Sequence, residues 1–284
     1  MMNIQTIGVI GAGQMGAGIA QAVATGGYRV ILYDIKEEYC ENAKEKIYAS
    51  LKKRAEAGKI TTDLVENTIE KINTTEDLKQ LGICDMVIEA VPEVLELKQS
   101  IFKELGTICR PDAILCTNTS TISVSQVMSE CTMKERCAGM HFFFPAPVMK
   151  LVEVIRSNDT TDATVSVIKQ VASYIGKIAI ECKFDTPGFI VNRCLFAFLQ
   201  EALHCYEDGI ATIEDIDTAM KQGLNHPMGP FEMMDMSGLD IYPHACESLR
   251  ELPVTTWECC DSVKKLIEEG RLGRKSGHGW YDYK

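Results

Sequence analysis

A histidine and a glutamate with the chemistry of a proton-transfer pair lie twelve residues apart, each in an apolar run. His141 begins the run His-Phe-Phe-Phe-Pro, and Glu153 lies inside Leu-Val-Glu-Val-Ile. An imidazole exchanges protons near neutral pH, and a carboxylate behind it fixes its tautomer and stabilises the imidazolium. A carboxylate in a buried strand needs a partner. Twelve residues allow a turn that joins adjacent strand ends, although a histidine before three phenylalanines is more often a satisfied core residue.

A glycine-rich turn near the N-terminus is the second candidate for chemistry. The run Gly11-Ala12-Gly13-Gln14-Met15-Gly16 follows an apolar strand at residues 4–10 and opens a helix that ends near Gly26-Gly27. A second strand at residues 29–33 then delivers Asp34 at its carboxyl end. Together these segments form the β-α-β unit of a dinucleotide-binding fingerprint, in the required order.

Each residue of this fingerprint has a separate expected task. Gly11 makes the tight turn, Gly13 lets a pyrophosphate approach the backbone, and Gly16 lets helix and strand pack closely. The pyrophosphate then rests on the free N–H groups of the helix start, among them those of Gln14 and Met15. Asp34 can accept hydrogen bonds from the ribose hydroxyls of NAD and would repel a 2′-phosphate, which favours NAD. The alternative, NADP, stays open because Lys36 follows two residues later.

The elements that must position these residues alternate through the first half of the chain. Residues 36–72 have the charge and period of a helical pair inserted between strands. Further strands are expected at 86–91, 114–117, 138–145, 151–155 and 177–180. The polar cluster Asn118-Thr119-Ser120-Thr121 follows one of them, at the strand end where doubly wound sheets bind ligands. Ser120 could equally be a helix N-cap.

The alternation stops after Asp185-Thr186-Pro187-Gly188. Long helices are expected at 189–206 and 213–220, with a third after His226-Pro227. The predicted fold class is therefore α/β: a Rossmann-type doubly wound sheet with an inserted helical pair in residues 1–187, followed by an all-α domain in residues 188–284 that serves substrate binding and dimerisation. Pro187-Gly188 is the expected hinge.

Composition restricts the remaining classes of function. The 284 residues are 46% hydrophobic and 24% charged, with a net charge of −11, which argues against nucleic-acid or anionic-membrane partners. No apolar run reaches the ~18 residues of a membrane span, and the first residues do not resemble a secretory signal. The twelve cysteines are scattered without metal-ligand spacing, so we expect reduced thiols, no metal site and a cytoplasmic protein.

One local charge pattern runs against this balance. Residues 41–60 hold six basic against three acidic side chains, hence +3. The pattern alone favours a solvated helical face over a landing surface for a polyanionic substrate.

The assembled motifs resemble the short-chain L-3-hydroxyacyl-CoA dehydrogenase family, and especially its bacterial 3-hydroxybutyryl-CoA dehydrogenases. The resemblance runs from end to end and rests on the glycine loop with Asp34, on Asn118-Thr119-Ser120, and on the run from His141 to Glu153. It continues in the segments at 185–193 (Asp-Thr-Pro-Gly-Phe-Ile-Val-Asn-Arg), 225–230 (Asn-His-Pro-Met-Gly-Pro) and 273–281 (Gly-Arg-Lys-Ser-Gly-His-Gly-Trp-Tyr). It implies NAD-dependent, reversible oxidation of (S)-3-hydroxybutyryl-CoA to acetoacetyl-CoA by a homodimer.

The resemblance also implies roles for single residues. His141 would be the general acid/base with Glu153 behind it, and Ser120 and Asn192 would hold the 3-oxygen and the thioester region. Cofactor contacts are implied for Glu93, Lys98 and Lys275. Ser50 matches a coenzyme A contact, which turns the basic 41–60 segment into a phosphate-facing helix. The active site would lie in a cleft between the domains and close on binding.

Three departures from the family pattern stand out. Phe144 replaces an asparagine expected near the cofactor, Phe184 is one residue more than the family has before the hinge, and residues 251–263 differ throughout. Two rival functions remain: a dehydrogenase of a free 3-hydroxy acid, whose relatives use a lysine base, and a non-catalytic, crystallin-like relative.

Overall fold

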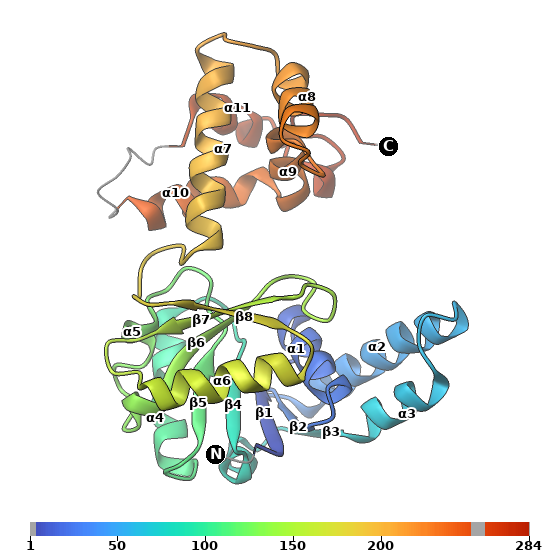
Figure 1. Ribbon diagram of the computed structural model, residues 1–284, viewed down its shortest axis with the longest axis vertical. Coiled ribbons are helices and arrows are strands. Elements are labelled where there is room, and N and C mark those ends of the chain that lie inside the picture. Colours follow the sequence, from blue (N-terminus) through green and yellow to red (C-terminus); the bar gives the residue numbers. More distant parts are fainter. Residues whose placement is uncertain (1–3, 251–258, 284) are drawn as a thin grey trace. The chain divides into compact units, whose positions relative to one another are not determined.

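The computed structural model describes residues 4–250 and 259–283, and Figure 1 shows its two compact units. The first unit ends at Thr186 and the second begins at Pro187, one residue before the border expected from the sequence. Each unit is described by itself. The departure from the family pattern at 251–263 lies mostly outside the described residues.

The first unit is built on one eight-stranded sheet with the order β3-β2-β1-β4-β5-β6-β7-β8. All neighbouring strands pair in parallel except β6 and β7, which are antiparallel. The chain runs both ways from the central β1/β4 pair, so the predicted doubly wound α/β class is confirmed. The strands are β1 (Thr6–Ile10), β2 (Arg29–Tyr33), β3 (Ile72–Thr75), β4 (Met86–Glu89), β5 (Ile114–Thr117), β6 (Cys137–Phe142), β7 (Leu151–Arg156) and β8 (Ile178–Cys182).

Helices connect these strands, and two of them form the predicted inserted pair. The pair consists of α2 (Glu37–Glu56) and α3 (Thr62–Glu70), which follow β2 and precede β3 in the sequence. The two helices pack on each other and extend away beside the β3 edge of the sheet (Figure 1). Ile72 was expected to close the pair but instead begins β3, an edge strand with one apolar residue and therefore no strand period. The other helices are α1 (Gln14–Thr25), α4 (Leu95–Ile108), α5 (Val124–Val127) and α6 (Asp162–Tyr174), with 3-10 turns η1 (Leu78–Ile83) and η2 (Lys134–Arg136).

The two faces of the sheet have different contents. Alternate strand residues such as Val9, Ile88 and Met140 pack in the main hydrophobic core together with α1 and α6. Successive strand residues point to opposite faces, so Glu89 and His141 lie on the other face. Glu153, between Val152 and Val154 of the core, lies on this same face.

The second unit consists of helices around a separate hydrophobic core. Leu203, Phe231, Leu239 and Val263 are fully buried in it. The three helices expected from the sequence are present with shifted ends. The elements are α7 (Val191–Glu207), α8 (Ile213–Gly223), α9 (Pro230–Ser237), η3 (Leu239–Ile241), α10 (Tyr242–Leu249), α11 (Asp261–Glu268) and η4 (Arg274–Ser276).

The C-terminal segment is tied to this unit by a buried carboxylate. Asp235, 1% exposed, accepts hydrogen bonds from the backbone N–H groups of Trp280 and Tyr281 and from the hydroxyl of Tyr283. Gly279 passes so close that a Cβ there would lie 2.0 Å from the Asp235 carboxylate. The glycine and aromatic residues of this segment are thus explained by packing.

The cysteines, the helix lengths and the candidate metal ligands can be examined in the described part of the chain. All twelve cysteines, each within the described residues, are free thiols, and nine of them are buried. In the described part of the chain, no helix is long and apolar enough to cross a membrane. The same residues contain no cluster of histidine, cysteine and acidic side chains that could hold a metal ion.

An ion-paired carboxylate at the edge of the sheet makes stability depend on pH. Glu181 on β8 accepts hydrogen bonds from Lys169 Nζ at 2.5 Å and Arg156 Nε at 2.7 Å, and these lower the pKa of its carboxyl below the ordinary 4.5. Unfolding restores the ordinary pKa, so the stabilisation is present above pH 4.5 and is lost as the pH falls through the folded pKa. We expect Glu181→Gln to lower the denaturant midpoint at pH ~7 and much less at pH ~3. An equal loss at both pH values would contradict this assignment.

Candidate active site

The candidate site lies at the end of the sheet where the inner strands β4, β5 and β6 have their carboxyl ends. Because β7 runs antiparallel to β6, its first residues reach the same edge. Glu89 and Thr117 are the last residues of β4 and β5, and His141 is the last but one of β6. This is the edge where doubly wound sheets bind ligands.

His141 and Glu153 face each other across β6 and β7, as the spacing predicted. They are partners in the strand register, and His141 Nδ1 lies 2.8 Å from Glu153 Oε2. His141 is 5% exposed and Glu153 is fully buried, while the Phe143 ring lies 4.6 Å from the imidazole. An ionised carboxylate only accepts hydrogen bonds, so Nδ1 donates and Nε2 becomes the nitrogen that exchanges protons.

Asn118 joins the ends of three strands beside this pair. Its backbone N–H donates to the carbonyl of Glu89, and its side-chain Oδ1 accepts from the N–H of Phe142 at 2.8 Å. The residue that follows His141 is therefore held by a side chain from β5.

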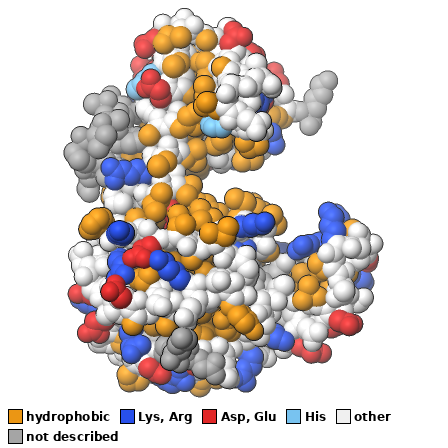
Figure 2. Space-filling model, viewed as in Figure 1, with side chains coloured by type: hydrophobic (Ala, Val, Ile, Leu, Met, Phe, Trp, Pro, Cys, Tyr) orange, Lys and Arg blue, Asp and Glu red, His pale blue; other side chains and the backbone are white. Residues whose placement is uncertain are grey.

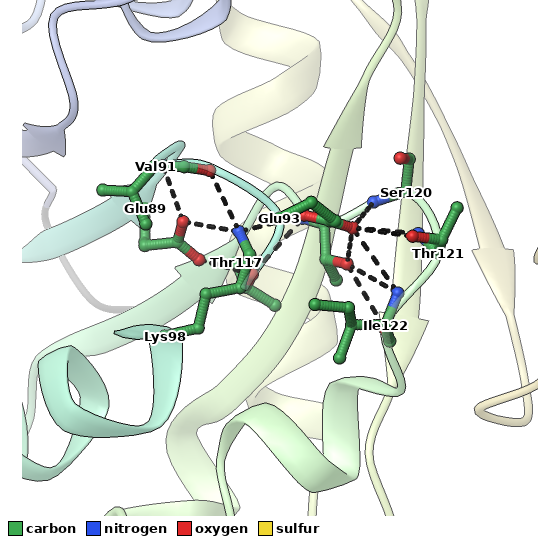
Figure 3. A network of polar contacts seen from close by, with 9 residues as sticks. Glu89, Val91, Glu93, Lys98, Thr117, Ser120, Thr121 and Ile122 are labelled. Carbon is green, nitrogen blue, oxygen red and sulfur yellow. Dashed lines mark hydrogen bonds and ion pairs between the residues drawn. The ribbon is translucent and has the colours of Figure 1, made fainter. Parts of the chain in front are cut away.

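Ser120 lies in a short segment that wraps around the carboxylate of Glu93 (Figure 3). Glu93 Oε1 accepts from the backbone N–H groups of Ser120, Thr121 and Ile122 at 2.9, 3.1 and 3.4 Å. The hydroxyls of Thr119 and Thr121 donate to the same oxygen. The alternative role as a helix cap is not the one seen, because Ser123 caps α5.

The pKa of Glu93 reflects these contacts. Partial burial alone would raise it, but the Lys98 ammonium 3.2 Å away and the hydrogen bonds from the 119–121 segment outweigh burial. The carboxyl pKa therefore lies below its ordinary value, and Glu93 is an anion at neutral pH.

Lys98 itself is almost completely enclosed, at 1% exposure. Its ammonium donates to Glu89 Oε1 at 2.7 Å, pairs with Glu93 and contacts the carbonyl of Val91 at 3.4 Å. Helix α4 buries Lys98, Phe102 and Leu105 on one face, which carries the lysine toward the sheet. Cofactor contact by Glu93 or Lys98 stays a prediction.

Glu89 and Thr117 also belong to this region, although no sequence motif predicts a role for them. Glu89 is fully buried, and Thr117 Oγ1 donates to its Oε2 at 2.7 Å. The available signal was an acid at the end of an apolar strand together with Lys98 on the apolar stripe of the next helix.

The glycine turn has the geometry that a dinucleotide requires. Gly11 has φ +98°, which favours glycine, and a Cβ on Gly16 would lie 1.8 Å from the Gly11 carbonyl oxygen. A Cβ on Gly13 would meet nothing within 4 Å, so the space above this residue is open. Gly13 is also the N-cap of α1 and offers no side-chain cap, so the N–H groups of the first turn are left to bind an anion.

Asp34 completes this geometry from the end of β2. Its Oδ2 accepts from the N–H of Ala12 in the glycine turn at 2.7 Å, and its Oδ1 accepts from the N–H of Ile35. The carboxylate is thereby held beside the turn, where a ribose would lie. The residues present fit NAD.

The open space at Gly13 gives a direct test of this fit. Gly13 has φ −67°, which alanine adopts without strain, so Gly13→Ala should fold with unchanged thermal stability. The added methyl group occupies the approach of the pyrophosphate, and we expect the Kd for NADH to rise roughly tenfold or more. Gly223→Ala is the matched control, because a Cβ there also meets nothing. Equal NADH affinity in both variants would refute the assignment.

Ser50, Asn192 and Lys275, the other residues predicted to bind substrate or cofactor, belong to three other elements. Ser50 is exposed on α2, and Lys and Arg side chains gather over the outer end of α2 and α3 (Figure 2). Asn192 lies in the first turn of α7, and Lys275 in η4 is paired with Asp240. Their contacts with cofactor and substrate stay predictions.

Phe144 occupies the position of the expected asparagine and is 58% exposed. Its side chain offers no hydrogen bond, whereas an amide there offers donors and an acceptor. We expect Phe144→Asn to lower the Kd for NADH, measured by fluorescence titration, by roughly two- to tenfold, the worth of about one hydrogen bond. Unchanged or weaker binding would sink this idea.

The fold and the glycine turn define a dinucleotide-binding protein, and comparisons with known proteins identify its family. Residues 6–186 match the NAD binding domain of 3-hydroxyacyl-CoA dehydrogenase, and residues 188–283 match the C-terminal domain. The chain belongs to the 3-hydroxyacyl-CoA dehydrogenase family, whose first domain binds NAD.

Three relatives illustrate the similarity. A probable 3-hydroxybutyryl-CoA dehydrogenase of Deinococcus radiodurans is 42% identical, over 97% of this chain and 99% of its own. The 3-hydroxyadipyl-CoA dehydrogenase of Escherichia coli is 40% identical, over 100% of this chain and 60% of its own. The crystal structure of (S)-3-hydroxybutyryl-CoA dehydrogenase PaaH1 from Ralstonia eutropha superimposes with a TM-score of 0.95 at 36% identity, covering 99% of this chain and 100% of that one.

Proposed function

We propose that this protein catalyses the reversible, NAD-dependent oxidation of (S)-3-hydroxybutyryl-CoA to acetoacetyl-CoA. The observation that carries the proposal is the buried His141–Glu153 pair at the ligand-binding edge of the sheet of a 3-hydroxyacyl-CoA dehydrogenase. Relatives named 3-hydroxybutyryl-CoA dehydrogenase, at about 41% identity over nearly the whole chain, support the short acyl group.

Oxidation of a secondary alcohol requires one proton to leave the hydroxyl as hydride leaves the carbon. Bound NAD supplies the hydride acceptor. His141 takes the hydroxyl proton on Nε2, and Glu153 holds the ring by Nδ1 and stabilises the imidazolium that forms. In the reverse direction the same imidazolium donates the proton to the 3-oxygen.

Ser120 and Asn192 are proposed to hold the substrate oxygens. The hydroxyl of Ser120 donates to the 3-oxygen, and the amide of Asn192 donates in the thioester region. Ser50 and the basic side chains of residues 41–60 are proposed to bind the phosphates of coenzyme A. The net charge of this segment is +3, so it attracts phosphate although the whole chain has a net charge of −11.

The assembly and setting are also part of the proposal. The helical unit exposes Ile210, Leu224 and Met236 by 70, 61 and 53%, which supports burial of part of this surface in a homodimer. Free thiols support a reducing compartment such as the cytoplasm. There the reaction would serve butyrate or fatty-acid metabolism.

A substrate panel tests the proposal. We expect the highest kcat/KM with acetoacetyl-CoA and NADH, followed as the loss of absorbance of the reduced cofactor, and much less with NADPH. A higher value for 3-oxoadipyl-CoA would move the protein toward its 3-hydroxyadipyl-CoA relative. Turnover of free acetoacetate alone would favour a hydroxy-acid dehydrogenase, and no turnover of any substrate would favour a non-catalytic relative.

A further inference from the structure

The three N–H donors of Lys98 face three acceptors of the chain itself. The acceptors are carboxylate oxygens of Glu89 and Glu93 and the carbonyl of Val91, at 2.7, 3.2 and 3.4 Å (Figure 3). The side chain is 1% exposed. An ammonium group has three donors, so this set matches its hydrogen-bonding capacity within the chain.

Neutral hydrogen-bond donors stabilise the excess negative charge beside Lys98. Two carboxylates share one ammonium, which leaves one negative charge in a largely enclosed cluster. Glu89 also accepts from the Val91 N–H and the Thr117 hydroxyl, both at 2.7 Å. Glu89 and Thr117 end neighbouring strands, so this half of the cluster is anchored to the sheet.

Glu93 connects that anchored half to the other half of the cluster, the loop of residues 119–122. Its Oε2 faces Lys98, while its Oε1 collects the three N–H groups of Ser120, Thr121 and Ile122. A carboxylate suits this arrangement because both of its oxygens only accept. A glutamine would turn an NH₂ group either toward the Lys98 ammonium or toward the backbone N–H groups of the loop.

We propose that Glu93 and Lys98 are positioning residues that set the backbone of Ser120 for substrate binding. This inference rests on the proposed function, because it takes Ser120 as the hydroxyl that contacts the 3-oxygen. Lys98 holds Glu93, Glu93 holds the N–H of Ser120, and Glu89 with Thr117 holds Lys98 to the sheet. The rate of reduction depends on this chain because a misplacement of about 1 Å at a reacting group costs on the order of 100-fold.

A double-mutant cycle with Ser120 tests this role separately from any contact with the cofactor. We expect Glu93→Gln and Lys98→Met to lower kcat for acetoacetyl-CoA, measured at saturating NADH, roughly ten- to a hundredfold. In a Ser120→Ala background the same two substitutions should have almost no further effect on kcat, because the group they position is gone. Glu181→Gln, which removes another lysine-paired carboxylate on the far edge of the sheet, is the matched control and should leave kcat unchanged.

Two results would overturn the inference: unchanged kcat in Glu93→Gln, or effects on kcat that multiply fully with that of Ser120→Ala. Lys98→Met leaves the buried carboxylate of Glu89 and the partly buried one of Glu93 without their cation. If it fails to fold, Glu93→Gln carries the test, because Glu93 is 33% exposed.

Amide hydrogen exchange keeps this test independent of the proposed function. Glu93→Gln should speed exchange at the N–H groups of Ser120, Thr121 and Ile122 while the strand amides of β4 and β5 stay protected. Unchanged exchange in the loop would overturn the positioning role even in an inactive protein. An inactive wild-type enzyme with faster loop exchange in the variant would instead refute only the proposed function.

Discussion

His141→Ala should lower kcat for reduction of acetoacetyl-CoA by about 10³-fold while the Kd for NADH stays within about twofold. Nδ1 of His141 lies 2.8 Å from the Glu153 carboxylate, so the imidazole delivers the proton to the substrate from Nε2. Alanine has no group that can replace it. The glycine turn and Asp34, which fit the cofactor, belong to other strands and are not disturbed. Steady-state kinetics and fluorescence titration of NADH measure the two constants.

The control for this variant is another histidine of the chain. His204 on α7 is 47% exposed, and His204→Ala should leave kcat within about twofold of wild type. Full activity in His141→Ala, with this control also active, would remove the imidazole from the mechanism while leaving the substrate assignment in place.

Glu153→Gln should lower kcat by about 10²- to 10⁴-fold, the second large effect. The amide oxygen can still accept from Nδ1, so the variant nearly preserves volume and hydrogen bonding in a position that is fully buried. It removes the negative charge that stabilises the imidazolium, and its NH₂ group can turn the ring to the wrong tautomer. Comparison of kcat with Glu153→Asp, which keeps the charge, measures this contribution.

A small effect would be informative in the opposite sense. If Glu153→Gln keeps kcat within about threefold of wild type and thermal unfolding is also unchanged, the carboxylate neither orients nor stabilises the imidazole, and its burial needs another explanation.

The pairing of His141 with Glu153 and the glycine turn could be predicted because both depend on short-range patterns. The βαβ order around Gly11, Gly13 and Gly16 could be recognised in the sequence because each glycine is explained by the space or the backbone conformation at its own position. One connection of eight residues, 143–150, joins the apolar strands β6 and β7, which places His141 and Glu153, twelve positions apart in the sequence, in register.

The Glu89–Lys98–Glu93 cluster could not be predicted in the same way. Its members come from a strand end, a loop and a helix, and their meeting depends on how α4 packs on the sheet. The resemblance implies cofactor contacts for Glu93 and Lys98, which stay predictions, but it does not show that the Lys98 side chain is 1% exposed and paired with both carboxylates. β3 was missed for a related reason: it is an edge strand, and its neighbour β2 rather than its own composition specifies it.

We propose that this chain transfers hydride between NAD(H) and the 3-position of a short acyl-CoA. Mixing the wild-type protein with acetoacetyl-CoA and NADH and measuring both products tests this most directly. We expect NADH to be consumed and (S)-3-hydroxybutyryl-CoA to appear in equal amounts. Consumption of NADH without that product, or no consumption with acetoacetyl-CoA, would contradict it.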